Sequence, residues 1–275
     1  MSFRPKDRPR GPKPGATREQ VERRARFEQA KRQSLRPGDD TAVLYGWHTV
    51  TAALQNPARK LRKLLATENA ARRLAEENLP ASAPPEIVRP DAIAARLPPD
   101  AVHQGLYAEA DPLPSPAIED VADDGIVLVL DQVTDPHNVG AIFRSAAAFA
   151  ARAIVTTTRH SPEATGVLAK AASGALEHVP LVTVQNLARA LGALKDRGFL
   201  AIGLDSSGDS DLAALPLRKP VALVFGAEGK GLRQLTKETC DAVARLELPG
   251  AIQSLNVSNA ASLSLYIATT KLRSG

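Results

Sequence analysis

Short apolar runs alternate with longer stretches of mixed character in the second half of the chain. These runs are rich in Val, Ile, Leu and Ala, as expected for strands that helices cover on both faces. The predicted strands are 126–130, 153–156, 181–184, 200–204, 221–225 and 244–248. Strands that alternate with helices predict an α/β fold with a parallel sheet, whose ligand sites lie beyond the carboxyl ends of the strands.

The first half, from 41 to 110, has shorter elements. Its pattern predicts strands at 61–67, 86–88 and 106–110, and helices at 46–55, 69–79 and 91–97. Three prolines within 111–116 then indicate a stiff linker. The predicted layout is an arm (1–40), a small α/β domain (41–112), a linker (113–124) and a larger α/β domain (125–275).

Positive charge is concentrated at the N-terminus. Residues 1–36 hold twelve Lys/Arg and four Asp/Glu, a charge of +8, whereas the remainder carries −3. The arm also has five prolines and almost no apolar periodicity, so we expect it to be disordered until it meets a partner. A basic arm favours a polyanionic partner such as nucleic acid, although a tail that only aids solubility has the same composition.

Composition narrows the class of protein. The chain has 275 residues, is 44% hydrophobic and holds one cysteine, Cys240, which excludes an internal disulfide framework. No apolar run approaches the length of a membrane span, and the N-terminus lacks the apolar region of a secretory signal. We therefore expect a soluble, cytoplasmic protein without membrane contact, in which Cys240 is a small, at least half-buried residue.

Polar residues follow the predicted strand 126–130. Asp135-Pro136 is a turn signal, and Asn138 occupies the position expected for a helix N-cap. Arg144 lies six residues further on, in an alanine-rich helix. By itself, Arg144 fits a surface ion pair as well as a functional residue.

Two further polar segments follow later strands. Glycines at 226, 229 and 231 surround Glu228, in a pattern that is neither the dinucleotide fingerprint nor the phosphate-binding loop. A second loop holds Ser254 and Asn256 and leads into an apolar helix predicted at 260–272. Alone, this loop also fits a cap of that helix.

Together, the three segments resemble the three motifs of the SpoU/TrmH-type RNA ribose methyltransferases, within the knotted SPOUT superfamily. The resemblance covers about residues 125–272. The residues at the motif positions are Asn138, Arg144, Glu228, Ser254 and Asn256. Segment 41–110 is similar to the ribosomal-protein-like substrate-binding domain of one branch, which includes bacterial 23S ribosomal RNA guanosine 2′-O-methyltransferases. Segment 170–177 matches another family stretch.

The resemblance implies a C-terminal trefoil knot that binds S-adenosylmethionine in a bent conformation. By position match, the donor contacts come from Leu204, Gly226, Leu246, Ile252 and Leu255. It also implies a homodimer with the site at the subunit interface. No metal is expected, since the sulfonium supplies the leaving group and the sequence has no His/Cys cluster with ligand spacing.

The expected reaction is methylation of a ribose 2′-hydroxyl, which depends on placing two bound substrates as near-attack neighbours. Arg144 is expected to hold the RNA phosphate and the ribose, because guanidinium suits bidentate contacts and is protonated at neutral pH. The resemblance also suggests a part for Arg144 in activating the hydroxyl. Asn138 and Asn256 are expected to orient Arg144 and the ribose, Glu228 to fix Arg144 or accept hydrogen bonds, and Ser254 to line the pocket.

Several alternatives remain. The two-domain layout favours 23S ribosomal RNA, with a guanosine target, or a ribosome precursor, over transfer RNA. A catalytically silent RNA-binding homologue would keep the scaffold, and a related knotted enzyme would methylate a base. A dehydrogenase would need a glycine-rich fingerprint at 131–138, which is absent. His137 is not expected to be catalytic, and Trp47 and His48 are expected to pack or to lie on an RNA-binding surface.

Overall fold

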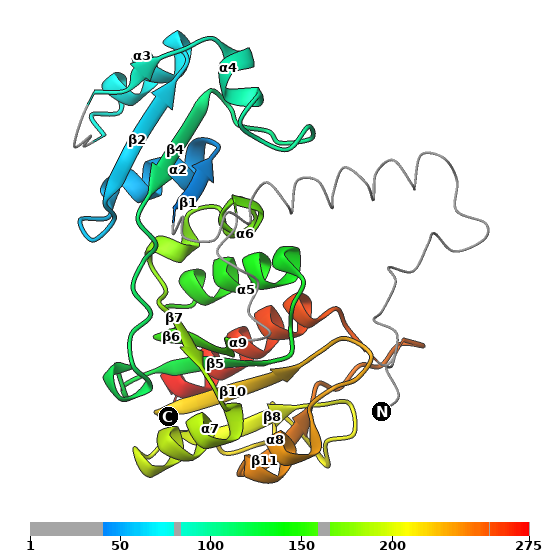
Figure 1. Ribbon diagram of the computed structural model, residues 1–275. Helices are drawn as coiled ribbons and strands as arrows, with labels where there is room; N and C mark the ends of the chain where they lie inside the picture. Colours follow the sequence, from blue (N-terminus) through cyan, green and yellow to red (C-terminus); the bar gives the residue numbers. More distant parts are fainter. Residues whose placement is uncertain (1–40, 80–83, 159–165, 253, 275) are drawn as a thin grey trace, which may run out of the picture. The chain divides into compact units, whose positions relative to one another are not determined.

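The structure is a computed structural model that describes residues 41–79, 84–158, 166–252 and 254–274. The basic arm predicted at 1–40 lies outside the described residues. Thr41–Gly275 is one compact unit, drawn from blue to red in Figure 1. It contains two sheets, a small one near its start and a larger one that carries the motifs.

Within the described ranges, the larger sheet has seven strands. They are β5 (Ile126–Asp131), β6 (Ala153–Thr157), β7 (Leu181–Val184), β8 (Leu200–Leu204), β9 (Ser210–Asp211), β10 (Val221–Gly226) and β11 (Ala242–Arg245). The order is β7-β6-β5-β10-β8-β11-β9, and every neighbouring pair is parallel. The predicted parallel α/β sheet is confirmed.

Helices cover both faces of this sheet, which explains the continuous apolar runs. On β5, Leu128 and Leu130 pack into the cluster that includes Phe143, whereas Val127 and Val129 pack on the opposite face. The first face carries α5 (Pro136–Ala148), α6 (Gly166–Ala172) and α9 (Val257–Ser274), and the second carries α7 (Leu187–Asp196) and α8 (Gln234–Thr239) (Figure 1). Successive side chains of a strand point to opposite faces, so each strand has buried side chains on both faces of the sheet.

Strand β10 brings two motifs together. It lies between β5 and β8, with Phe225 paired with Leu130 and Gly226 paired with Asp131. From β5 the chain adds β6 and β7 on one side of β5, and it then places β8 to β11 on the other side. The order of the strands therefore reverses between β5 and β10. Open α/β sheets bind ligands at such switch points, beyond the carboxyl ends of the strands.

The small sheet has the order β1-β4-β2-β3. Its elements are β1 (Ala42–Tyr45), α2 (Trp47–Gln55), β2 (Leu61–Ala66), α3 (Glu68–Glu76), β3 (Glu86–Ile87), α4 (Pro90–Ala94) and β4 (Leu106–Ala110). Three strands and three helices match the prediction to within a few residues, but β1 was not predicted. Its four residues gain their stability from antiparallel pairing with β4, which lies about sixty residues later.

A buried ion pair joins the small sheet's segment to the larger part. Arg59 Nη2 lies 2.6 Å from Glu177 Oε1, and the two side chains are only 4% and 2% exposed. Asn56 Nδ2 donates to Glu177 Oε2 at 2.7 Å, and Arg59 Nη1 donates to the Asp111 carbonyl at 2.9 Å. Asn56 and Arg59 are therefore both fixed by the carboxylate of Glu177, the last residue of the 3₁₀ turn η2 (Ala175–Glu177).

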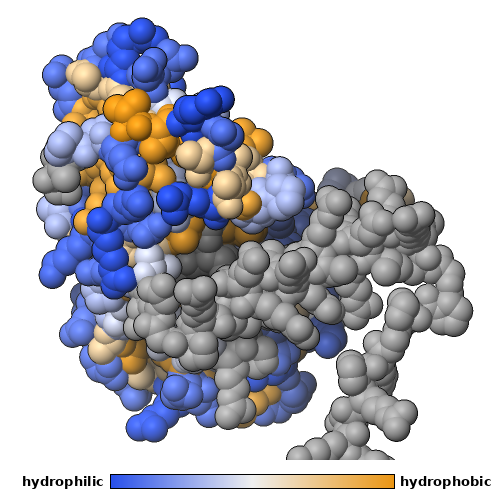
Figure 2. All heavy atoms as spheres, turned by 45° about the horizontal axis from the view of Figure 1, so that its top comes forward, coloured by the Kyte–Doolittle hydropathy of each residue, from blue (hydrophilic) through white to orange (hydrophobic). Residues whose placement is uncertain are grey.

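Hydrophilic side chains predominate on the face in Figure 2, with hydrophobic patches between them. None of the helices in the described ranges is long and apolar enough to cross a membrane. Over the same part of the chain, no group of three or more His, Cys, Asp or Glu side chains is placed to hold a metal ion.

Candidate active site

A hydrogen-bond network joins the three motifs. Glu228 Oε1 accepts from Asn138 Nδ2 at 3.1 Å and from Asn256 Nδ2 at 2.5 Å. Asn256 Nδ2 also lies 2.9 Å from Asn138 Oδ1, and the backbone N–H of Val257 reaches Glu228 Oε1 at 3.3 Å. Residues separated by up to 118 positions thus meet at one carboxylate oxygen. The second oxygen, Oε2, makes no hydrogen bond within the described part of the chain.

Glu228 is presented by a tight turn after β10. The backbone N–H groups of Lys230 and Gly231 both donate to the Ala227 carbonyl, and Ala227 and Gly231 form an isolated β-bridge. A Cβ on Gly226 would lie 2.1 Å from the Gly231 carbonyl carbon, so only glycine permits this close approach. The turn therefore holds the Glu228 side chain at its exposed tip, facing Asn138 and Asn256.

The predicted N-cap of α5 was wrong. Asp135 is the N-cap, since its side chain accepts from the His137 backbone N–H at 3.1 Å, and Pro136 occupies the first helical position. Proline is favoured there because its fixed φ suits the helix and no N–H is lost. Asn138 is therefore the third residue of the helix, and its side chain is available to contact Glu228 and Asn256 instead of capping.

Asn256 does cap a helix, and it joins the network as well. Its Oδ1 accepts from the Ser258 backbone N–H at 2.9 Å, at the start of α9, while its Nδ2 donates to Glu228. The capping interpretation of this loop is thus correct, and the same amide also donates a hydrogen bond to Glu228. Capping fixes the orientation of the side chain, which directs the donor group towards the carboxylate.

Two aspartates at strand ends, neither predicted from the sequence to have a role, hold the loop around Glu228. Asp131, at the end of β5, is buried and accepts from Arg233 Nε at 2.6 Å and from the Arg233 backbone N–H at 3.1 Å. Asp205 follows β8 and accepts from the Leu232 backbone N–H and from Lys237 Nζ. The two aspartates therefore fix Leu232 and Arg233, directly after the turn that carries Glu228.

The pKa of Asp205 is low despite its burial. Burial alone would raise the pKa, but hydrogen bonds from Ser207, Lys237 and the Leu232 backbone lower it from 3.8 to about 2. A carboxyl whose pKa is depressed in the folded state stabilises the fold above its unfolded pKa, and this contribution is lost as the pH falls through the folded pKa. The relevant window is therefore from about pH 4 down to about pH 2.

Replacing Asp205 with asparagine should lower the free energy of unfolding at neutral pH, with the deficit shrinking between pH 4 and pH 2. Urea unfolding of both proteins at several pH values measures this difference. Asp209→Asn is a matched control, because Asp209 is an exposed neighbour on the same loop. A deficit of the same size at pH 7 and pH 2.5 would contradict the role assigned to the Asp205 charge.

The residues predicted to contact the methyl donor come from three neighbouring strand ends. Leu204 ends β8, Gly226 ends β10 and Leu246 follows β11, and these strands are adjacent in the sheet. Ile252 and Leu255, on the loop before α9, are large apolar side chains that are 75% and 39% exposed. Exposed apolar side chains and a glycine that is closely approached by backbone suit the carbon-rich surface of S-adenosylmethionine, so the residues present fit this group.

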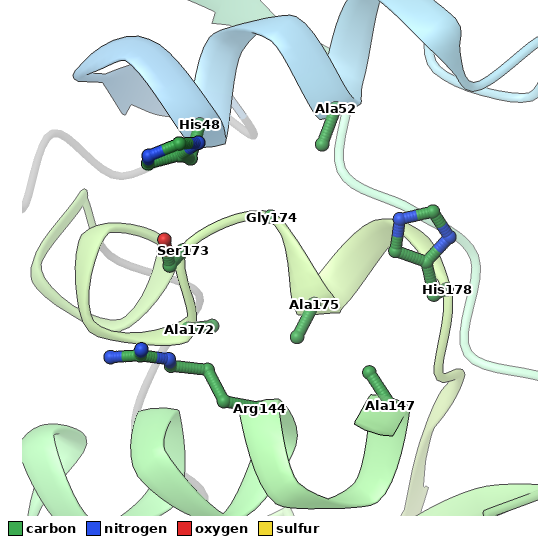
Figure 3. Close-up of a pocket in the computed structure, with 9 residues that line it drawn as sticks. All are labelled: His48, Ala52, Arg144, Ala147, Ala172, Ser173, Gly174, Ala175 and His178. Atoms are coloured by element: carbon green, nitrogen blue, oxygen red, sulfur yellow. The ribbon is translucent and has the colours of Figure 1, made fainter. Parts of the chain in front are cut away.

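Arg144 is not part of this network. It lies six residues after Asn138, which turns it about 240° around the helix axis. Its side chain lines a different cleft, with His48 of α2 above it and the turn after α6 between them (Figure 3). Arg144 is exposed, and none of the described side chains forms a hydrogen bond or ion pair with it.

The remaining predicted residues are placed as follows. Ser254 and His137 are exposed, and neither side chain is hydrogen-bonded to a described residue. Trp47 is buried beneath Arg73, whose guanidinium carbon lies 3.8 Å from the ring centre, so its packing role is confirmed. Cys240 is half-buried as expected, and burial together with Asp241 raises its pKa to about 11, which keeps the thiol protonated.

Similarity to known proteins covers both parts of the chain. Residues 125–266 match the model of the SpoU rRNA Methylase family, and residues 43–116 match that of the RNA 2′-O ribose methyltransferase substrate binding family. The chain is 40% identical over 232 residues to the 23S rRNA (guanosine-2′-O-)-methyltransferase RlmB of Ralstonia nicotianae, covering 82% of this chain and 93% of the relative. RlmB of Pseudomonas putida is 36% identical over 81% of this chain and 94% of its own.

Solved structures share the fold. The SpoU methyltransferase AviRb from Streptomyces viridochromogenes aligns with a TM-score of 0.74 and 24% identity, over 91% of this chain and 98% of its own. A TrmH-family protein from Porphyromonas gingivalis aligns with a TM-score of 0.72 over 94% of this chain and 99% of its own. With the family model matched over the sheet that carries all three motifs, this chain belongs to the SpoU rRNA methylase family.

Proposed function

We propose that this protein transfers a methyl group from S-adenosylmethionine to a ribose 2′-hydroxyl of 23S ribosomal RNA, at a guanosine. The observation that carries the proposal is the contact of Asn138, Glu228 and Asn256, which gathers all three motifs beside the strand ends that fit the donor. The choice of RNA and nucleotide rests on relatives such as RlmB of Ralstonia nicotianae, which is named a guanosine-2′-O-methyltransferase of 23S rRNA.

S-adenosylmethionine supplies an electrophilic methyl group and a neutral thioether as the leaving group. The chain's own task is to place the ribose hydroxyl in line with that methyl group and to accept its proton. Glu228 Oε1 is occupied by three donors, so Oε2 is the atom left to accept a hydrogen bond from the ribose. Asn138 and Asn256 hold the carboxylate in place, and Ser254 lies on the same loop to line the pocket.

Arg144 positions the RNA phosphate and the target ribose in this proposal, and it does so for the site of a second subunit. Within one chain, Arg144 and the network of Glu228 line separate clefts. A homodimer that brings α5 of one copy to the network of its partner removes this separation. Tyr266 and Leu263, exposed apolar residues on α9 beside α5, are suited to such an interface.

Three further expectations belong to the same proposal. The C-terminal segment is threaded as a trefoil knot, the domain boundaries are those given from the sequence, and the enzyme works in the cytoplasm on ribosomal RNA or its precursor. The basic arm adds phosphate contacts that carry no sequence information.

The direct test incubates the protein with methyl-labelled S-adenosylmethionine and unmodified total RNA, followed by mapping of the labelled nucleotide. A labelled 2′-O-methylguanosine in 23S rRNA is the expected result. Label in transfer RNA would keep the reaction and change the substrate, whereas label on a base would refute ribose methylation. No label in any RNA fraction, with donor binding intact, would favour a catalytically silent RNA-binding protein.

A further inference from the structure

A cleft of about 420 Å³ lies between α2, α5 and the turn that follows α6. We propose that this cleft binds the phosphate backbone of the RNA, and that His48 and His178 contact the phosphates in addition to Arg144. The inference deepens the proposed function, on which it rests, because it assigns a backbone-binding site to residues outside the three motifs. His48 comes from the small sheet's segment, so the site spans both parts of the described unit.

The lining of the cleft is basic and contains no carboxylate. Its side chains with hydrogen-bonding groups are His48, Arg144, Ser173 and His178, and the rest of the lining is alanine and glycine. In Figure 3, His48 and Arg144 lie on either side of Ser173 at one end, and His178 lies at the other. His48, Arg144 and His178 are all exposed, so their donor groups are accessible to a ligand.

The nearest carboxylate along the chain is held away from the cleft. Glu177 directly precedes His178, but its two oxygens are taken by Arg59 and Asn56 and its side chain is 2% exposed. Its charge is therefore neutralised by the buried ion pair with Arg59, and Glu177 does not compete with an anion for Arg144. An arginine without a carboxylate partner, beside imidazole and hydroxyl donors, is an arrangement suited to phosphate oxygens.

Gly174 allows the two walls of the cleft to approach each other. It has φ +89°, and a Cβ there would lie 2.7 Å from Ala52 Cβ and 2.9 Å from the His48 carbonyl oxygen. Any larger residue would push α2, and His48 with it, away from this turn. The alanines Ala147, Ala172 and Ala175 leave space in the same way, so the cleft admits a backbone segment between its two basic ends.

Backbone phosphate is favoured over a base or a small metabolite by this chemistry. The donors at the two ends of the cleft are separated by small apolar residues, and the lining contains no Phe, Tyr or Trp to stack on a base. Contacts of this kind fix the register of an RNA without reading its sequence. The cleft would thus position the strand while the Glu228 network of the second subunit acts on the ribose.

The test compares the affinity of His48→Gln, His178→Gln and the double variant for a 23S rRNA transcript and for an unrelated 16S rRNA transcript, at several salt concentrations. We expect the double variant to bind both transcripts about tenfold or more weakly, since two hydrogen bonds to charged groups are lost. The control is Arg189→Gln, which removes one exposed positive charge on α7, on the opposite face of the sheet. Its affinity should change by less than about twofold.

Affinity for S-adenosylmethionine should stay unchanged in all variants, which verifies that they are folded. Unchanged RNA affinity in the double variant, or equal losses in Arg189→Gln, would overturn the proposal. If the protein methylates no RNA but the histidine variants still bind both transcripts more weakly, the proposed function fails and the phosphate site stands. If it methylates 23S rRNA and the histidine variants bind normally, the function stands and the phosphate site fails.

Discussion

The Arg144→Ala protein should transfer methyl groups about 10²–10³-fold more slowly than the wild type in single turnovers. Removal of the guanidinium takes away the group proposed to place the phosphate and ribose, and loss of positioning or of one charged contact has effects of this size. Because Arg144 is exposed and has no partner among the described side chains, the fold should be unaffected. The rate is measured with saturating donor and RNA, so that a change in affinity does not mask it.

Arg189→Ala serves as the matched control, since it removes an exposed arginine from the opposite face of the sheet. A near-normal rate with normal RNA binding in Arg144→Ala would refute the role of this arginine. Mixing Arg144→Ala with Glu228→Ala subunits adds a second test. If Arg144 serves the partner's site, each mixed dimer regains one intact site and activity returns, whereas sites built within one chain would stay inactive.

The Glu177→Ala protein should lose about 3–5 kcal/mol of its free energy of unfolding. The substitution leaves Arg59 buried at 4% exposure without its carboxylate, and it also removes the acceptor of Asn56. An uncompensated buried charge is far more costly than the loss of an exposed pair. Equilibrium unfolding in urea, followed by tryptophan fluorescence, measures the change, because Trp47 lies in the adjoining helix α2.

Asp124→Ala is the control for this prediction. Its partner Arg152 lies 2.7 Å away, but both side chains are largely exposed, so a loss of at most about 1 kcal/mol is expected. Replacing both members of the buried pair, as Arg59→Met with Glu177→Leu, should recover much of the stability. Equal effects of Glu177→Ala and Asp124→Ala would show that burial of the Arg59–Glu177 pair contributes nothing.

Six of the seven strands described in the large sheet were predicted, because helices cover both faces and most residues of these strands are apolar. The two-residue strand β9 is polar and was not predicted. The prediction was less accurate where pairing, and not composition, sets the limits. The strand predicted at 244–248 is β11 at Ala242–Arg245, because its partners on β8 end at Leu204. Leu246 and Leu248 continue the apolar pattern beyond the last paired residue, so periodicity alone misplaced the strand.

The family resemblance supplied the candidate site residues, but not their arrangement. Asn138, Glu228 and Asn256 meet as expected, whereas Arg144 faces another cleft because six residues of helix turn it away. Asp131 and Asp205 were missed because their partners are remote: the Asp131–Arg233 contact spans 102 residues. Such pairs have no local signal, and only the positions of these aspartates at strand ends could have indicated them.

The central place of β10 imposes an order in time on the growing chain. β5 and β8 are both made before β10, yet each needs β10 as its neighbour, so both keep an unpaired edge until residue 226 has left the ribosome. The network around Glu228 must wait longer still, for Asn256. The small sheet, in contrast, has all its strands by Ala110. A nascent chain of this enzyme therefore completes the part expected to hold RNA long before it can modify it.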